Sequence, residues 1–157
     1  MMTIGTAAPG EGWDSVCLGA CSLAIILALV IGVGLASGLI IRHVVQTAPV
    51  WLGVVFGFRR SPAARWITLP MFLFWLLLMA LIWLFLAGLP SPVSGHFNPG
   101  EIAMTIVVGG ASIAGIWCAA RSRAGLSAAA AAGLFASAAV LQAICFRVSL
   151  MPGIAHR

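Results

Sequence analysis

The stretch WITLPMFLFWLLLMALIWLFLAGL at residues 66–89 decides the fold class. It holds no charged side chain, and it is longer than the roughly 20 apolar residues that a helix needs to cross a hydrocarbon core of about 30 Å. A backbone surrounded by lipid must satisfy its own hydrogen bonds, and no period-two alternation runs through the stretch. We therefore expect a transmembrane helix here.

Three further stretches resemble this one in length and apolar character. We expect spans at about residues 16–41, 66–89, 102–120 and 126–146. The composition agrees, because 62% of the residues are hydrophobic, 7% are charged and the mean hydropathy is +1.16, whereas about a quarter of the residues in soluble domains are charged. The chain is predicted to be a single transmembrane domain, 1–157, with no soluble domain.

The segment 44–58 is apolar but short for a fifth span. At about 1.5 Å per residue it reaches only about 22 Å, and Pro49 interrupts it. A weakly polar stripe with arginine at both ends suits a helix that lies in the headgroup plane or dips back into the bilayer. The predicted fold is thus an all-α integral membrane four-helix bundle with one additional interfacial or re-entrant helix between the first two spans. The stripe contains Arg42, Gln46, Pro49, Gly53, Gly57 and Arg60.

The arginines set the expected orientation. Cytoplasmic loops collect basic residues, because translocating them is unfavourable against the membrane potential and the anionic inner leaflet. With four crossings, the clusters would lie inside and both chain termini outside, in the periplasm. Arginine without lysine, together with abundant alanine and glycine, is typical of a GC-rich bacterial genome and hence favours an inner membrane. The clustered arginines are Arg42, Arg59, Arg60, Arg65, Arg121 and Arg123.

These arginines are also candidate contacts for anionic lipid headgroups. The formal net charge of +5 would suit nucleic acid as well, but the arginines flank apolar runs and do not follow one polar face. Membrane lipids are therefore the expected partner, and nucleic acid is not.

Small residues spaced four apart predict how the spans pack. Inside a membrane the hydrophobic effect does not hold helices together, and small residues let helix backbones approach closely enough to pack. Such pairs occur in the first, third and fourth spans, which we expect to form a tight bundle. The span 66–89 is bulky all round and would face lipid or a partner. The packing residues are Gly34, Gly38, Ala111, Gly115, Ala129 and Gly133.

The cysteines define a redox alternative. With the topology above, Cys17, Cys21 and Cys145 reach the outer side, where a disulfide from Cys145 to either of the others is allowed, while Cys118 stays near the cytoplasm. Four helices with outward cysteines invite comparison with the disulfide-generating quinone reductases. That comparison fails on the motif, because a Cys-x-x-x-Cys spacing stands in place of Cys-x-x-Cys. Free thiols that behave as small apolar residues are the favoured interpretation.

The remaining polar residues exclude several functions. No expected span carries an ionisable group in its middle, which argues against ion-coupled transport and against the small multidrug transporters. His43 and His96 would lie on opposite sides, so no haem is expected, and neither another cofactor nor a metal. We predict a non-enzymatic structural or accessory protein that associates with itself or with other membrane subunits. A thiol redox enzyme and an anionic-lipid-binding protein are the alternatives.

Overall fold

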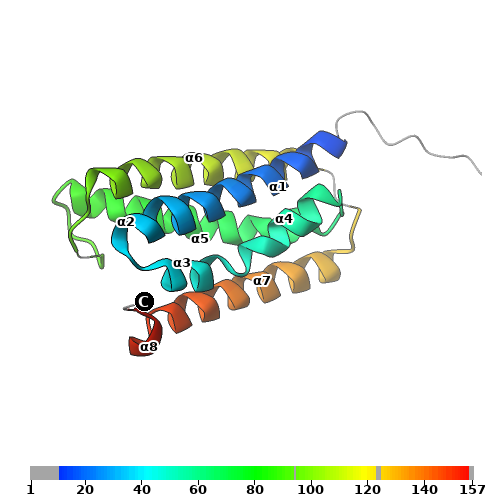
Figure 1. Cartoon of the computed structure of the whole chain (residues 1–157). Helices are drawn as coiled ribbons and strands as arrows, with labels where there is room; N and C mark the ends of the chain where they lie inside the picture. Colours follow the sequence, from blue (N-terminus) through cyan, green and yellow to red (C-terminus); the bar gives the residue numbers. More distant parts are fainter. Residues whose placement is uncertain (1–10, 94, 123–124, 156–157) are drawn as a thin grey trace, which may run out of the picture.

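The computed structural model describes residues 11–93, 95–122 and 125–155, and all regular structure within them is helical (Figure 1). The all-α class predicted from the sequence is therefore confirmed. The elements are α1 (Glu11–Leu27), a π-helical segment η1 (Ala28–Gly34), α2 (Leu35–Ser37), α3 (Ile40–Thr47), α4 (Val50–Phe58), α5 (Ala64–Leu86), α6 (Pro99–Arg121), α7 (Ala128–Ser149) and α8 (Pro152–Ala155).

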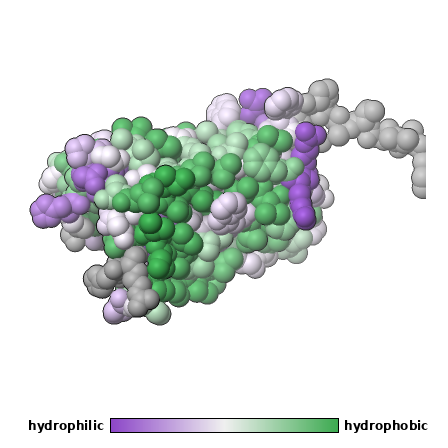
Figure 2. Space-filling model, viewed as in Figure 1, coloured by the Kyte–Doolittle hydropathy of each residue, from purple (hydrophilic) through white to green (hydrophobic). Residues whose placement is uncertain are grey.

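Four helices in the described part of the chain are long and apolar enough to cross a membrane. One of them is the continuous run of α1, η1 and α2, and the other three are α5, α6 and α7. Hydrophobic residues cover the middle of the face seen in Figure 2, and hydrophilic residues gather at its two ends. The spans predicted from hydropathy thus correspond to Gly12–Ser37, Ala64–Leu86, Pro99–Arg121 and Ala128–Ser149.

Local sequence signals fix where several helices begin and end. Asn98 caps α6, since its side chain accepts a hydrogen bond from the Glu101 amide at 2.8 Å and the Glu101 carboxylate accepts one from the Asn98 amide at 2.9 Å. Pro99 occupies the first helical position, as the sequence predicts. Gly38 ends α2 with φ +72°, a left-handed conformation that glycine adopts without a Cβ clash, and Leu39 N–H then bonds Gly34 C=O at 3.0 Å.

The segment between the first two spans is a bent pair, α3 and α4, whose axes meet at 53°. The pair runs back along the first span in order: Gly34 lies against His43, Ser22 against Gly53, and Gly19 against Gly57. A helix lying flat in the headgroup plane would not follow the first span in this way. The additional helical segment is therefore present, and it takes the form of a broken helix that traverses the bundle.

Because α3 and α4 traverse the bundle, the arginines lie at both of its ends. The arginine-bearing end, as we call it, comprises the end of α4, the start of α5 and the end of α6, and it carries Arg59, Arg60, Arg65 and Arg121. Arg42 lies at the opposite end, contrary to the single cluster expected from the sequence. The start of α1 lies at the arginine-bearing end and α8 at the other, whereas the topology expected from the sequence would place both of them opposite the arginines. Arg123 falls outside the described residues.

α5 has two faces: one exposes Leu73, Leu77, Trp83 and Leu84, as its bulky sequence predicts, and the other is buried in the bundle. It contacts α4, α6 and α7, and Phe72 and Trp75 are at most 1% exposed. The close contact with α6 forms because Gly115 leaves room for the Phe72 ring. Large residues thus fill the middle of the bundle, and small residues on the neighbouring helix accommodate them.

α7 is the peripheral helix. Only 17% of its most apolar stretch is buried, against 39% for the first span. Ala129 and Gly133 are exposed, so the predicted tight packing of the fourth span through these residues is wrong, whereas Gly34 and Gly115 are buried and Ala111 is half-buried. Gly38, the remaining residue of the predicted set, serves as a helix cap.

Candidate functional site

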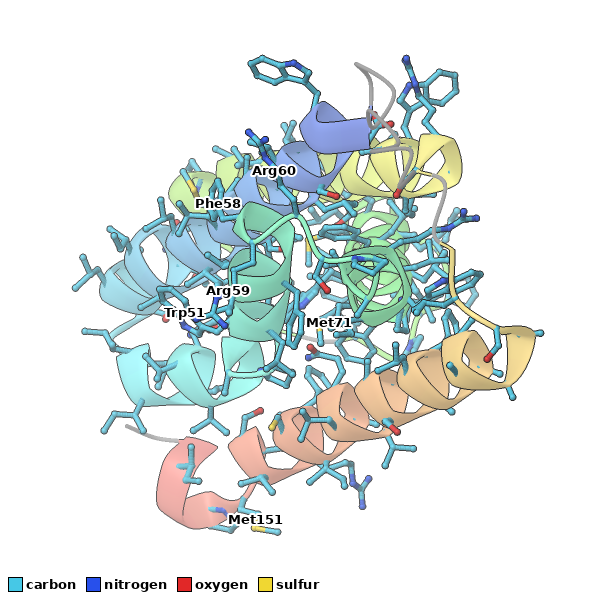
Figure 3. All side chains as sticks on the ribbon, turned by 90° about the vertical axis from the view of Figure 1, so that its right-hand side faces the viewer. Trp51, Phe58, Arg59, Arg60, Met71 and Met151 are labelled. Atoms are coloured by element: carbon cyan, nitrogen blue, oxygen red, sulfur yellow. A yellow bond between two sulfur atoms is a disulfide. The ribbon has the colours of Figure 1, made fainter. Side chains whose placement is uncertain are left out.

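Three features of the structure offer surfaces or groups for function: the arginine-bearing end, a cluster of three cysteines, and the outer face of α7. In Figure 3, which looks onto the arginine-bearing end, Arg59 and Arg60 emerge where α4 stops. A Cβ added at Gly12 would lie 3.5 Å from Arg60 Nη1, so Arg60 passes close to the start of α1. Arg60 also adopts φ 52°, a left-handed conformation unusual for a residue with a side chain.

Arg65 ties two helices together at the same end. Its Nη1 donates a hydrogen bond to Ser122 C=O at 2.6 Å, and its guanidinium lies 4.7 Å from the centre of the Trp66 ring. Arg59, Arg60 and Arg121 are exposed. Arginines from α5, α6 and the end of α4 therefore present guanidinium groups at one end of the bundle, where they would meet phosphate groups if the bundle spans a bilayer.

The thiol cluster joins α1 to α6. Cys17 and Cys118 form a disulfide with a Cα–Cα distance of 6.4 Å, and Cys21 Sγ lies 4.0 Å from Cys17 Sγ. Cys17 is in the second turn of α1 and Cys118 in the last turn of α6, so both lie toward the arginine-bearing end. Three of the four cysteines are thereby brought together, and the interpretation of the cysteines as free thiols is wrong for Cys17 and Cys118.

Cys145 is not part of this cluster. It lies in the last two turns of α7, at the end opposite the arginines, and its thiol is free. The disulfide from Cys145 to Cys17 or Cys21 that the predicted topology allowed is not formed, because the traverse of α3 and α4 separates the start of α1 from the end of α7. Cys118, expected on the other side from Cys17, is its partner instead.

A buried amide connects α7 to the broken helix. Gln142 Nε2 donates a hydrogen bond to Gln46 C=O at 3.0 Å, and both side chains are at least 96% buried. Gln46 is next to the last residue of α3, so this bond satisfies a carbonyl where the helix is interrupted. Buried hydroxyls such as those of Ser22 and Thr68 bond carbonyls one turn back in their own helices.

The outer face of α7 lacks a neighbour within the described chain. Nothing lies within 4 Å of a Cβ placed at Gly133, and the residues that follow it along the same face are exposed. Phe146, on the inner side, contacts Phe74 of α5 with ring centres 5.1 Å apart. α7 is therefore held from one side only. The exposed residues of this face are Ala136, Ser137, Val140, Leu141 and Ile144.

The described histidines do not form a metal site with the acidic residues or cysteines. His43 and His96 lie at the same end of the bundle, which corrects the placement expected from the sequence, and His43 Nδ1 lies 2.8 Å from Leu39 C=O. Within residues 11–93, 95–122 and 125–155, no group of three or more His, Cys, Asp or Glu side chains is arranged to hold a metal ion. His156 lies outside these ranges.

A close contact between the backbones of two helices was not identified from the sequence. A Cβ at Gly57 would lie 2.5 Å from Gly19 N and 2.9 Å from Ser15 C=O, so α4 and α1 touch backbone to backbone. The signal was available, because Gly53 and Gly57 are spaced four apart. These glycines were assigned to a polar stripe of an interfacial helix, and their packing role was missed.

Comparisons with protein-family models, with curated proteins and with solved structures found no match for the chain. Function therefore has to be argued from the arrangement of the side chains alone.

Proposed function

We propose that the protein is a non-enzymatic structural or accessory subunit of a bacterial inner membrane, and that the outer face of α7 binds a transmembrane helix. The observation that carries this proposal is the unpartnered small-residue surface of α7 around Gly133 and Ser137. Small residues let two helix backbones approach closely inside a membrane, where lipid contact gives little drive for association. A second copy of the chain or another subunit would supply the helix.

The polar groups inside the bundle support a structural role. Buried hydroxyls are bonded within their own helices, and the Gln142 amide bonds the carbonyl of Gln46 between helices. Ion-coupled transporters keep an ionisable residue inside a span as a binding group. In the described middle parts of the long helices, the polar residues are serine, threonine and glutamine, and none is ionisable.

We further propose that α3 and α4 together cross the bilayer as one broken span. The chain then crosses five times, and the arginine-bearing end faces the cytoplasm by the positive-inside rule. The start of α1 would be cytoplasmic, and the end of α7 periplasmic. Support comes from the ordered contacts of α3 and α4 along the whole first span. An interrupted helix is tolerated at membrane depth when protein buries the break, as it does at Gln46 and Thr47.

Mass measurement in mild detergent tests the accessory role. The native chain is expected to appear as a complex, either with itself or with a copurifying subunit, and Gly133→Leu is expected to release the monomer, because a leucine on this face holds the neighbouring helix away. Gly110→Leu is the matched control, since Gly110 is an exposed helical glycine on α6 with nothing within 4 Å of an added Cβ. A native monomer, or equal loss of the complex in both variants, would contradict the proposal.

Anionic-lipid binding remains a second candidate, favoured by Arg59, Arg60 and Arg121 at one end. Each arginine near an anionic surface contributes about 1 kcal/mol. The chain can be reconstituted into nanodiscs of matched thickness, with and without phosphatidylglycerol. When detergent then strips the bilayer, the native chain should retain phosphatidylglycerol from the discs that contain it. If the double variant Arg59→Gln, Arg121→Gln retains as much phosphatidylglycerol as the native chain, anionic-lipid binding at this end is excluded.

A further inference from the structure

In the cluster of Cys17, Cys21 and Cys118, the free thiol lies beside one sulfur atom of the disulfide. Cys17 is bonded to Cys118 on another helix, while the free thiol of Cys21 sits one turn along the same helix, with its Sγ 4.0 Å from that of Cys17. A thiol held against one sulfur of a disulfide is placed for attack on that sulfur and not on the other. Free Cys145, at the other end of the bundle, has no such neighbour among the described cysteines.

We propose that Cys17, Cys21 and Cys118 form a thiol–disulfide exchange site, in which the disulfide moves between the Cys17–Cys118 and Cys17–Cys21 pairs. Cys21, once deprotonated, attacks Cys17 Sγ; the Cys17–Cys118 bond breaks as the Cys17–Cys21 bond forms, and Cys118 leaves as a thiolate. The proton lost by Cys21 is taken up by Cys118. One disulfide and one thiol are present before and after the step, so no external oxidant or reductant is consumed.

The residue spacing permits both disulfides. Residues four apart on an α-helix have Cα atoms about 6 Å apart, which lies within the usual span of a disulfide. The observed Cys17–Cys118 pair, with its Cα–Cα distance of 6.4 Å, lies within the same span. Exchange therefore needs side-chain rotation and a small adjustment of α1 against α6, and the helices keep their places.

The positions of Cys21 and Cys118 along their helices determine what the exchange would change. Cys21 and Cys118 are both half-buried, but Cys118 precedes Arg121 by one turn at the end of α6, whereas Cys21 lies a turn deeper along α1 than Cys17. Exchange thus transfers the free thiol from the deeper position to one near the polar boundary. There it meets electrophiles or disulfides from the aqueous side, and at the same time the covalent link between α1 and α6 is released.

Differential alkylation of the purified full-length protein tests this site. The oxidised protein in mild detergent is treated with iodoacetamide without reductant, then reduced, labelled with N-ethylmaleimide and mapped by peptide mass spectrometry. In the native chain, iodoacetamide is expected on Cys145 and divided between Cys21 and Cys118, with Cys17 always labelled after reduction. In Cys21→Ser, Cys118 should escape iodoacetamide, while Cys145→Ser should leave the division unchanged.

Two results would overturn the proposal. Complete alkylation of Cys21 with none at Cys118 in the native chain would mean a static disulfide. Alkylation of all four cysteines before reduction would mean that no disulfide forms. The Cys118→Ser variant adds an independent check, because exchange chemistry requires it to form the Cys17–Cys21 disulfide and to exclude iodoacetamide from both residues. Both measurements are independent of the complex formed through α7.

Discussion

The α1–α4 contact and the outer face of α7 use the same kinds of residue and have opposite surroundings. Gly57 of α4 meets the backbone of Gly19 so closely that an added Cβ would lie 2.6 Å from Gly19 Cα. Gly133 of α7 has nothing within 4 Å of the same added atom. Both glycines belong to small-residue patterns spaced four apart. Such a pattern allows another helix to approach closely, but it does not determine which helix that is.

Chain connectivity accounts for this difference. The glycine turn at Gly38 and the short break after Thr47 send α3 and α4 straight back along α1, so their small residues are brought together by a tight hairpin. α7 follows the segment after Arg121 and packs its inner side on α5 and α3. Its small-residue face is left outward, and no other described part of the chain covers it.

The strongest way to break the comparison is Gly57→Leu. A leucine there would have to displace the Gly19 backbone, which cannot move away as a flexible side chain would. We expect the free energy of unfolding to fall by about 3 kcal/mol, the upper part of the usual range for overpacking. Denaturant titration in mixed micelles measures it, with Gly110→Leu as the control. Equal stability of the two variants would show that α4 does not pack on α1 at this point.

A smaller loss is expected from Gln142→Leu. The substitution removes the hydrogen bond to Gln46 C=O and leaves that carbonyl without this donor where α3 ends. Hydrogen bonds between membrane helices contribute about 1 kcal/mol, so the same titration should show a loss of about that size. Gly110→Leu, at an exposed position outside this contact and outside the outer face of α7, is the control for added bulk. A Gln142→Leu variant as stable as the native chain would argue against an α3–α7 contact.

Arg60→Gly should give a small gain. Its left-handed backbone costs about 1–2 kcal/mol for a residue with a side chain. The greater freedom of glycine in the unfolded chain offsets about 0.4–1 kcal/mol of the relief. We expect a net stabilisation of about 0.5 kcal/mol, whereas Arg59→Gly, next to it but at φ −75°, should destabilise. If Arg60→Gly is less stable than the native chain, the guanidinium of Arg60 makes a stabilising contact that outweighs the cost of its left-handed backbone.

The smallest effect on folding is expected from Gly133→Leu. The added side chain enters open space, so the free energy of unfolding of the isolated chain should stay within about 0.5 kcal/mol of the native value. Together with a loss of the native complex, this result would sharpen the comparison, because one glycine would serve folding and the other association. A large loss of stability would instead place Gly133 inside the bundle.

Much of the architecture could be predicted from the sequence, and the errors about which residues share an end of the bundle have one origin. The four long helices, the Asn98 cap and the added helical segment follow from local hydropathy and capping chemistry. The path of residues 44–58 does not, because its length and Pro49 fit either a surface helix or a broken one. The surface-helix interpretation placed everything before this segment at the other end of the bundle. It therefore brought Cys17 together with Cys145 and Arg42 together with Arg59, two pairs that the structure separates. Pairings such as Cys17–Cys118 depend on which helices are neighbours, and no local pattern encodes this.

The central claim is that α3 and α4 carry the chain across the membrane. Single cysteines at Ile40 and Pro62, both exposed and on either side of this pair, can be introduced into a chain whose four native cysteines are replaced by serine. Labelling of intact cells and of inverted vesicles with a membrane-impermeant maleimide then reports the side of each position. We predict that residue 40 is labelled from the periplasm and residue 62 from the cytoplasm; labelling of both from the same side would contradict the account.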